Sequence, residues 1–310
     1  MFKSIRSFLK MLSLPQAACE VYCREKRYER FEKQGGRVRH LALYRLAHRI
    51  LIPILTISTK SAGQRLLILR DGRKRTHRPT IFCPTHIGGA DIEMALEAVH
   101  VPCWLALGDP RELYKSASGM MLQMNGLICL DVLEKRDRLC ARAKMEALLK
   151  KGGNLLIFPE GAQNVSRNAL LSPLYAGSVE LAITCGAEIV PMGIERMGDT
   201  YFCVLGEPIS YEGRSLAERY ALTAELRDSM ATLKWEIAEA LPPLRREELS
   251  EKTYEDFING ILSMNTAYSL TVDYIVQTQF HPKNITEPAQ AFAHLENLIP
   301  CRENAFLFRK

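Results

Sequence analysis

The fold that we expect for this 310-residue chain follows from one segment, Thr80-Ile-Phe-Cys-Pro-Thr-His-Ile-Gly-Gly-Ala-Asp91. Its apolar run, Ile81 to Cys83, ends at Pro84 and is followed by a histidine, two glycines and an aspartate. Such a run, closed by proline and glycine, is typical of a buried strand that leads into a turn. The segment therefore predicts a strand, a loop and a helix that begins near Asp91.

The same segment holds a candidate acid–base pair, His86 and Asp91. On one continuous helix these two residues would lie about 140° apart, so their side chains meet only if the chain turns between them. Gly88 and Gly89 allow that turn. The Asp91 carboxylate would then accept a hydrogen bond from one imidazole nitrogen and leave the other as a base. The alternative is a loop histidine beside a helix-capping aspartate.

Composition and charge narrow the class of protein. The chain is 47% hydrophobic and long enough to bury a large core. Residues 1–79 hold 19 Lys and Arg but 5 Asp and Glu, a net charge of +14, which leaves −8 for residues 80–310. A basic N-terminal quarter indicates an anionic partner, either nucleic acid or an anionic membrane surface. Residues 1–79 contain no motif that reads nucleic acid, so we expect a membrane and no nucleic acid.

The nine cysteines include no Cys-x-x-Cys pair. This usage favours reduced thiols in a cytoplasmic protein and no metal site.

Residues Met1 to Leu14 have the pattern of an interfacial helix. Their apolar residues fall on one stripe, with the cations off it: Phe2, Ile5, Phe8, Leu9 and Leu12. Packing of this stripe against the domain is the open alternative. A later apolar run, Ile50 to Ile57, is far shorter than the roughly 20 residues of a membrane span. We therefore expect a peripheral protein on the inner face of the cell membrane, with residues 1–63 as its membrane-associating segment.

From Leu66 onward, short apolar runs alternate with helical patterns. We expect strands near residues 66–69, 80–83, 103–107, 127–130, 154–158, 188–193 and 201–205, and helices near 91–99, 111–124, 136–150, 174–185 and 215–241. This alternation predicts an α/β fold with a mainly parallel sheet flanked by helices on both faces. The predicted catalytic domain is 64–243. A C-terminal helical extension, 244–310, follows, and its first helix is expected from 250 to 278.

Polar residues follow several predicted strands, at the sheet edge where α/β proteins bind ligands. The strand at 80–83 leads to His86, the strand at 127–130 to Asp131, and the strand at 154–158 to Pro159-Glu160-Gly161. One candidate base, a carboxylate to orient it and a second carboxylate nearby predict an acid–base site.

Four blocks of the sequence resemble, in order, the motifs of the glycerol-phosphate and lysophosphatidic acid acyltransferases. His86-Ile-Gly-Gly-Ala-Asp91 is similar to their His-x4-Asp motif, and Phe158-Pro159-Glu160-Gly161 to their Phe-Pro-Glu-Gly motif. Gly126-Leu-Ile-Cys-Leu-Asp131 resembles the Gly-led segment between these two, and Ile189-Val190-Pro191 the last apolar-proline block. The resemblance covers residues 80–195 and implies the acyltransferase-type fold.

The resemblance also implies a reaction and roles for these residues. His86 would remove the proton from an acceptor hydroxyl, and Asp91 would hold the imidazole tautomer. The acyl donor would be acyl-CoA or acyl carrier protein, and the leading acceptor a lysophospholipid, 1-acyl-sn-glycerol-3-phosphate, with no metal or bound cofactor. Glu160 and Gly161, with Phe158 and Pro159, would shape the acceptor site; otherwise Glu160 caps the following turn.

Two positions depart from the family pattern. Gln163 stands where an arginine usually follows Phe-Pro-Glu-Gly, and Val132 where an arginine follows the Gly-led segment. Both changes remove a cation that would bind an acceptor phosphate. Arg167 is the expected replacement, with Lys135 or Arg136 as further candidates. Otherwise the acceptor carries no phosphomonoester, or the chain is a catalytically silent lipid-binding protein on the same scaffold.

Overall fold

The computed structural model describes residues 5–74, 76–108, 114–166, 169–242, 250–264 and 271–282. The chain divides into two compact units, residues 1–280 and residues 281–310. Nearly all of the described residues belong to the first unit. Arg167, one of the predicted acceptor-binding residues, lies outside the described residues, as does Phe2 of the predicted interfacial helix.

Helices and strands alternate through the first unit. The described helices are α1 Ile5–Ser13, α2 Gln16–Gln34, α3 Leu41–Ser61, α4 Asp91–Val99, α5 Ala117–Asn125, α6 Lys135–Leu149, α7 Gly177–Cys185, η2 Leu216–Glu218, α8 Arg219–Ala240, α9 Thr253–Met264 and α10 Val272–Thr278. The described strands are β1 Arg65–Asp71, β2 Thr80–Pro84, β3 Cys103–Leu107, β4 Leu127–Cys129, β5 Asn154–Ile157, β6 Glu188–Met197, β7 Thr200–Leu205 and β8 Ile209–Ser210.

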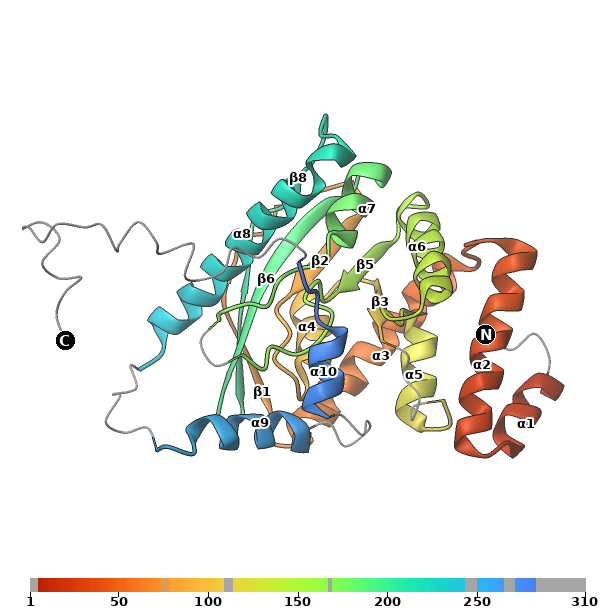
Figure 1. Ribbon diagram of the computed structural model, residues 1–310, viewed down its shortest axis with the longest axis horizontal. Helices are drawn as coiled ribbons and strands as arrows, with labels where there is room; N and C mark the ends of the chain where they lie inside the picture. Colours follow the sequence, from red (N-terminus) through yellow and green to blue (C-terminus); the bar gives the residue numbers. More distant parts are fainter. Residues whose placement is uncertain are drawn as a thin grey trace, which may run out of the picture. The chain divides into compact units, whose positions relative to one another are not determined.

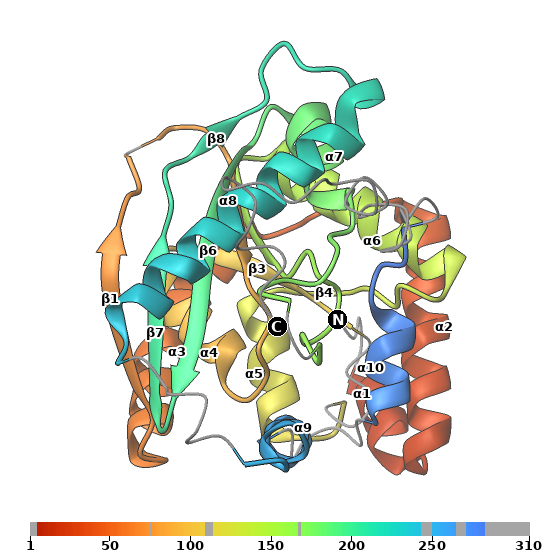
Figure 2. The same ribbon diagram turned by 60° about the vertical axis from the view of Figure 1, so that its left-hand side comes forward.

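The strands form one mixed sheet in the order β1-β7-β6-β2-β5-β3-β4, with β8 paired to β6 (Figures 1 and 2). The five strands from β6 to β4 in this order are mutually parallel. β7 and β8 are antiparallel to β6, and β1 is parallel to β7. The prediction of a mainly parallel sheet flanked by helices is therefore confirmed. Parallel neighbours bring the carboxyl ends of β2, β5 and β3 to one edge of the sheet.

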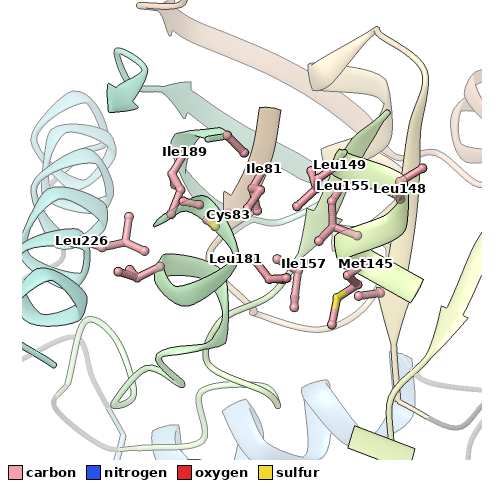
Figure 3. Close-up of a cluster of buried hydrophobic side chains, with 14 of the residues drawn as sticks. Ile81, Cys83, Met145, Leu148, Leu149, Leu155, Ile157, Leu181, Ile189 and Leu226 are labelled. Atoms are coloured by element: carbon pink, nitrogen blue, oxygen red, sulfur yellow. The ribbon is translucent and has the colours of Figure 1, made fainter. Parts of the chain in front are cut away.

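Successive residues of the central strands face opposite layers of helices, because side chains alternate along a strand. Ile81 and Cys83 of β2 pack with residues of α6, α7 and α8 (Figure 3). Phe82, between them, packs on the other face with Met94 of α4 and Ile52 of α3. All five residues of β2 are buried, which explains why the sequence there is a continuous apolar run.

Helix α3 differs from the expectation. It is one helix of 21 residues that runs through Pro53, and by length and composition it is long and apolar enough to cross a membrane. The run Ile50 to Ile57 is only part of this helix, so the expectation that the apolar segment is far shorter than a membrane span is wrong. That expectation counted an uninterrupted apolar run and ignored the polar residues that a helix tolerates. The core helices of soluble proteins can have the same length and composition, but they are mostly buried. α3 is mostly exposed, because 17% of its most apolar 18-residue stretch is buried.

The C-terminal extension also differs, because two helices replace the single helix expected from 250 to 278. The hydroxyl of Thr271 accepts a hydrogen bond from the backbone N–H of Tyr274 and so caps the start of α10. A capped helix start inside the expected helix marks a new element. α9 and α10 pack together, through Ile261 and Ile275, on Ala162 and Val165 of the loop after Gly161.

Candidate active site

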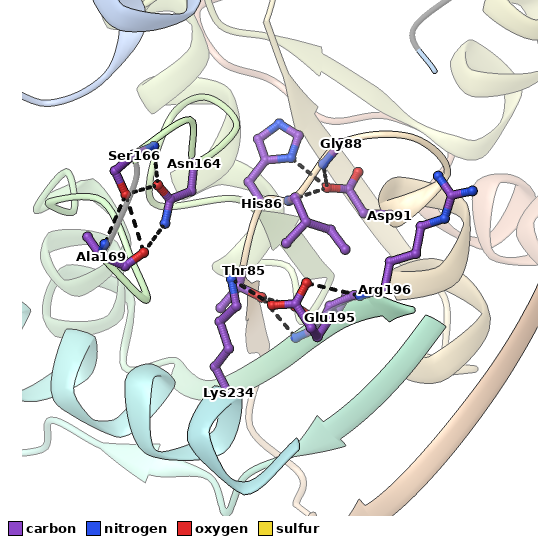
Figure 4. A network of polar contacts seen from close by, with 12 residues as sticks. Thr85, His86, Gly88, Asp91, Asn164, Ser166, Ala169, Glu195, Arg196 and Lys234 are labelled. Atoms are coloured by element: carbon purple, nitrogen blue, oxygen red, sulfur yellow. Dashed lines mark hydrogen bonds and ion pairs between the residues drawn. The ribbon is translucent and has the colours of Figure 1, made fainter. Parts of the chain in front are cut away.

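His86 and Asp91 lie in contact just beyond the carboxyl end of β2 (Figure 4). The imidazole Nδ1 is 2.7 Å from Oδ2 of Asp91, and the same oxygen accepts the backbone N–H groups of Ile87 at 2.8 Å and Gly88 at 2.7 Å. Gly88 and Gly89 adopt φ values of 89° and 68°, a region that glycine enters at little cost. These two glycines make the turn that the spacing of His86 and Asp91 requires.

Asp91 orients the His86 imidazole so that it can act as a base. Because Asp91 accepts at Nδ1, that nitrogen carries the proton and Nε2 keeps its lone pair. Among the described residues, no hydrogen bond occupies Nε2 of His86. Burial opposes the charged imidazole, but the charge and hydrogen bond of Asp91, together with the charge of Glu160, outweigh it, so the pKa of His86 is raised. Both side chains are buried, His86 at 8% and Asp91 at 1% exposure.

Glu160 is buried, and its carboxylate binds the backbone of two segments beside the site. One carboxylate oxygen accepts the backbone N–H of His86 at 2.8 Å, and the other accepts that of Ser172 at 2.8 Å. Burial raises the pKa of Glu160, against the effect of these two hydrogen bonds. The Glu160 side chain is not part of the cavity wall described below, so in this structure it positions the loop that carries His86.

The rest of the Phe-Pro-Glu-Gly block forms a wall beside the histidine. The Phe158 ring lies against the His86 ring, with 4.3 Å between ring centres. The Pro159 carbonyl accepts the backbone N–H of Tyr175 at 2.8 Å. Gly161 has a φ of 79°, and a Cβ there would lie 2.5 Å from the Tyr175 ring. The close approach of Tyr175 therefore depends on glycine at position 161.

A cavity of about 320 Å³ opens beside His86. Its walls are mainly apolar and come from the carboxyl ends of β3, β4 and β5 and from α6 and α7: Ala106, Leu107, Leu130, Met145, Ile157, Phe158 and Leu181. An apolar cavity of this size with a few polar groups is typical of a small-molecule site.

Two arginines that the sequence did not single out, Arg138 and Arg142, line the same cavity. Arg142 pairs with Glu146 at 3.1 Å and also with Glu180. Arg138 donates to the carbonyl of Val132 at 2.6 Å, and no carboxylate pairs with it among the described residues. The Arg138 guanidinium thus lies next to Val132, the position where this chain lacks the arginine of the family pattern. The two arginines are four residues apart on a predicted helix that follows the Gly-led segment, so they share one face of that helix. This spacing could have identified them from the sequence.

The other cations considered from the sequence face elsewhere. Arg136 pairs with Glu32 and lies over the Tyr28 ring, both on α2. Lys135 is exposed and does not line the cavity.

The C-terminal extension supplies a further wall that sequence reasoning missed. Phe280 lines the cavity and lies 5.2 Å, centre to centre, from the Tyr175 ring. The Tyr175 hydroxyl donates to the carbonyl of Thr278 at 2.9 Å, and Gln279 donates to the carbonyl of Gln163 at 2.8 Å. Gln163, at the position of the missing arginine, is buried beneath this extension.

Residues 68–195 match the family model described as Acyltransferase. These residues therefore form a domain of the acyltransferase type. The matched segment runs from β1 to β6 and contains His86, Asp91 and the block 158–161, so the superfamily that the four sequence blocks predict is confirmed.

Among solved structures, this chain is similar to the 1-acyl-sn-glycerophosphate (LPA) acyltransferase PlsC from Thermotoga maritima. The two are 13% identical, with a TM-score of 0.49, and the similarity covers 77% of this chain and 89% of that chain. No sequence among the curated proteins is significantly similar to this chain.

Proposed function

We propose that this acyltransferase transfers a fatty acyl group from acyl-CoA or acyl carrier protein to a lysophospholipid hydroxyl, with 1-acyl-sn-glycerol-3-phosphate as the leading acceptor. The observation that carries the proposal is the His86–Asp91 pair beside an apolar cavity, with no hydrogen bond at Nε2 of His86 from any residue that the structure describes. A paired base next to a space lined by aliphatic side chains fits proton removal from a hydroxyl close to a bound acyl chain.

In the proposed reaction, Nε2 of His86 takes the proton of the acceptor hydroxyl as its oxygen attacks the thioester carbonyl. The carbon–oxygen ester bond forms, the carbon–sulfur bond breaks, and the leaving thiolate receives the proton from the imidazolium. Asp91 stabilises the imidazolium through the 2.7 Å contact at Nδ1. No acyl-enzyme is required, because both substrates meet at one base.

Arg138 is our candidate for the acceptor phosphate. It lines the cavity, and its guanidinium lies at the Val132 carbonyl, next to the position where the family pattern has an arginine. Arg142 is already paired with Glu146 and Glu180, which leaves Arg138 as the better cation.

We propose that the acceptor comes from a membrane. The part of the protein that contacts this membrane in our proposal is helix α3. Large apolar side chains on one stripe of α3 are exposed: Leu43, Leu46, Ile50, Ile54 and Ile57. The opposite face is buried against the domain through His48, Leu51 and Ile52. A helix with one docked face and one exposed apolar face lies along an interface. Exposed Arg45 and Arg49 flank the stripe and favour anionic lipid.

The N-terminal helix adds less to this surface. Leu9 and Leu12 of α1 are exposed, but Met11 is buried against Cys19 and Cys23 of α2. We therefore place the main contact on α3, with α1 as a second contact.

The decisive test of the activity uses purified full-length protein and labelled acyl donor. Acyl-CoA and acyl carrier protein are each supplied with 1-acyl-sn-glycerol-3-phosphate, neutral lysolipids, and acyl-amino-acid or glycolipid hydroxyls. The proposal expects the ester product with the phosphate acceptor. Transfer only to acceptors without a phosphate would move the function to the alternative acceptor class. If no combination of donor and acceptor gives a product, the chain is a catalytically silent lipid-binding protein.

The membrane placement is tested by sedimentation with vesicles that contain phosphatidylglycerol. An Ile50→Asp, Ile54→Asp double variant should lose most of its binding, whereas deletion of residues 1–14 should lose part of it. Leu170→Asp, at an exposed leucine in a loop far along the chain from α3, is the matched control. Bound protein should be extracted by alkaline carbonate, and protein that resists extraction would contradict a peripheral placement.

A further inference from the structure

A second pocket lies on the other side of α6 from the active-site cavity. Its volume is about 380 Å³, and its walls come from α2, residues 35–40, the start of α3, β3, β4 and α6. α2 lies beside α6 (Figure 1). Cys140, Ala141 and Lys144 of α6 line this pocket, whereas Arg138, Arg142 and Met145 line the active-site cavity. The two spaces share a helix as a wall but no lining residue.

The charged side chains that the structure describes in the lining of this pocket are all positive. Six Lys and Arg side chains line it, and none of the Asp and Glu residues in the described part of the chain does. Lys26 pairs with Glu29, and Arg27 pairs with Asp137. The lining also includes Arg30, and it includes the three cations used below, Arg37, Arg39 and Lys144. A concave surface with this excess of positive charge attracts anions.

Lys144 and Trp104 both line the pocket and both carry N–H donors. The Lys144 ammonium donates to the Leu127 carbonyl at 3.2 Å and lies 5.2 Å from the centre of the Trp104 ring, and no described carboxylate pairs with it. Desolvation, with Arg30 and Arg27 nearby, lowers the pKa of Lys144 to about 8. Trp104 is 5% exposed, and its indole N–H has no hydrogen-bond partner among the described atoms. Buried donors normally have acceptors, so an acceptor is missing here.

The loop that closes the pocket is fixed in place. A Cβ at Gly36 would collide with the backbone of Ala143 on α6, so the loop packs directly on that helix. Val38 is buried in the main core, and Lys151 donates to its carbonyl at 2.7 Å. A preformed pocket needs little ordering to bind a ligand.

We propose that this pocket is a second binding site, for an anion that carries a phosphate group, with Lys144, Arg37 and Arg39 as its cations and the Trp104 N–H as an added donor. A phosphate offers several charged acceptor oxygens to converging N–H groups. The phosphate belongs either to a soluble compound or to a lipid headgroup, because α3, with its exposed apolar stripe, begins at the edge of the pocket.

The test uses Trp104 as the reporter. The sequence has two tryptophans, and Trp235 is 54% exposed on α8, so Trp235→Phe leaves Trp104 as the single tryptophan, which excitation at the long-wavelength edge of the absorption band selects over tyrosine. This parent is titrated with inorganic phosphate, with potassium chloride at matched ionic strength, and with phosphatidylcholine vesicles with and without phosphatidic acid. Calorimetry with the same probes gives the affinity independently.

We expect a saturable change with phosphate or with phosphatidic acid vesicles, and none with chloride or phosphatidylcholine alone. Lys144→Met and Arg37→Gln should each weaken binding at least about tenfold, because a charge-assisted hydrogen bond is lost. Lys150→Met, at an exposed lysine that follows α6, should bind like the parent. Arg37 is exposed, so its variant should fold even if Lys144→Met does not.

A response to soluble phosphate alone assigns a soluble ligand, and a response to phosphatidic acid vesicles alone assigns a headgroup. No saturable response to either probe would overturn the proposal, as would an affinity that neither variant changes. His86→Ala should bind normally, which separates this site from the active-site cavity. Acyl transfer is not measured, so the result stands whether or not the proposed reaction is correct.

Discussion

Replacement of Asp91 by asparagine separates an electrostatic role from a structural one. The amide oxygen can still accept the N–H groups of Ile87 and Gly88, which lie 2.8 and 2.7 Å from the present carboxylate oxygen, so the turn should persist. The lost quantity is the negative charge beside His86. Two unit charges about 4 Å apart interact by about 4 kcal/mol at an effective dielectric constant near 20. We therefore expect kcat/KM to fall by about 10³-fold.

The pH profile provides a second, independent readout of the same variant. The base must be deprotonated to act, so kcat/KM of the wild type should rise with pH through a midpoint above 6.5, the ordinary pKa of histidine, because the folded protein raises the pKa of His86. In Asp91→Asn the midpoint should move to lower pH while the plateau falls. Glu97→Gln, which removes a carboxylate from the same helix, should change neither. A plateau within about tenfold of the wild type and an unmoved midpoint would exclude an electrostatic role for Asp91 and leave it as a helix cap.

Three further variants test the surrounding geometry. Gly161→Ala should lower the free energy of unfolding by about 2 kcal/mol or more in urea titrations, since the new Cβ meets Tyr175. Gly152→Ala, with a φ of 71° but open space, should lose only about 1 kcal/mol; equal losses would contradict the contact. Arg138→Gln should raise KM for a phosphate acceptor about tenfold with a smaller change in kcat, whereas Arg136→Gln should not, and an unchanged KM would remove Arg138 from the site. Glu160→Gln should destabilise the fold by about 2 kcal/mol and lower kcat more than it raises KM, because one of two buried backbone donors loses its acceptor; wild-type stability would show that the carboxylate is dispensable.

The local parts of the fold and site were predictable because they depend on neighbours in sequence. The five buried residues of β2 read as an apolar run, and Gly88 and Gly89 showed that a turn allows His86 to reach Asp91. The chain order of strands and helices likewise follows from local periodicity. These signals required no knowledge of distant contacts.

The remaining features depend on packing between distant segments. Glu160 accepts from the backbone of His86, 74 positions earlier, and Phe280 reaches the cavity from a helical extension whose sequence carries no motif. Arg138 lies on the cavity side of α6, and Arg136 two residues earlier faces α2; this orientation depends on how α2 docks. The length of α3 was missed because Pro53 and polar residues interrupt its apolar pattern without ending the helix.

The His86→Ala variant shows whether His86 is the base of an acyl transfer. The measurement is kcat/KM for transfer of a labelled acyl group to 1-acyl-sn-glycerol-3-phosphate, with His77→Ala, in an exposed loop, as the matched control. We expect a loss of at least about 10²-fold for His86→Ala with unchanged vesicle binding, and wild-type activity for His77→Ala. Equal activity of His86→Ala and the wild type would contradict a role for His86 as the base.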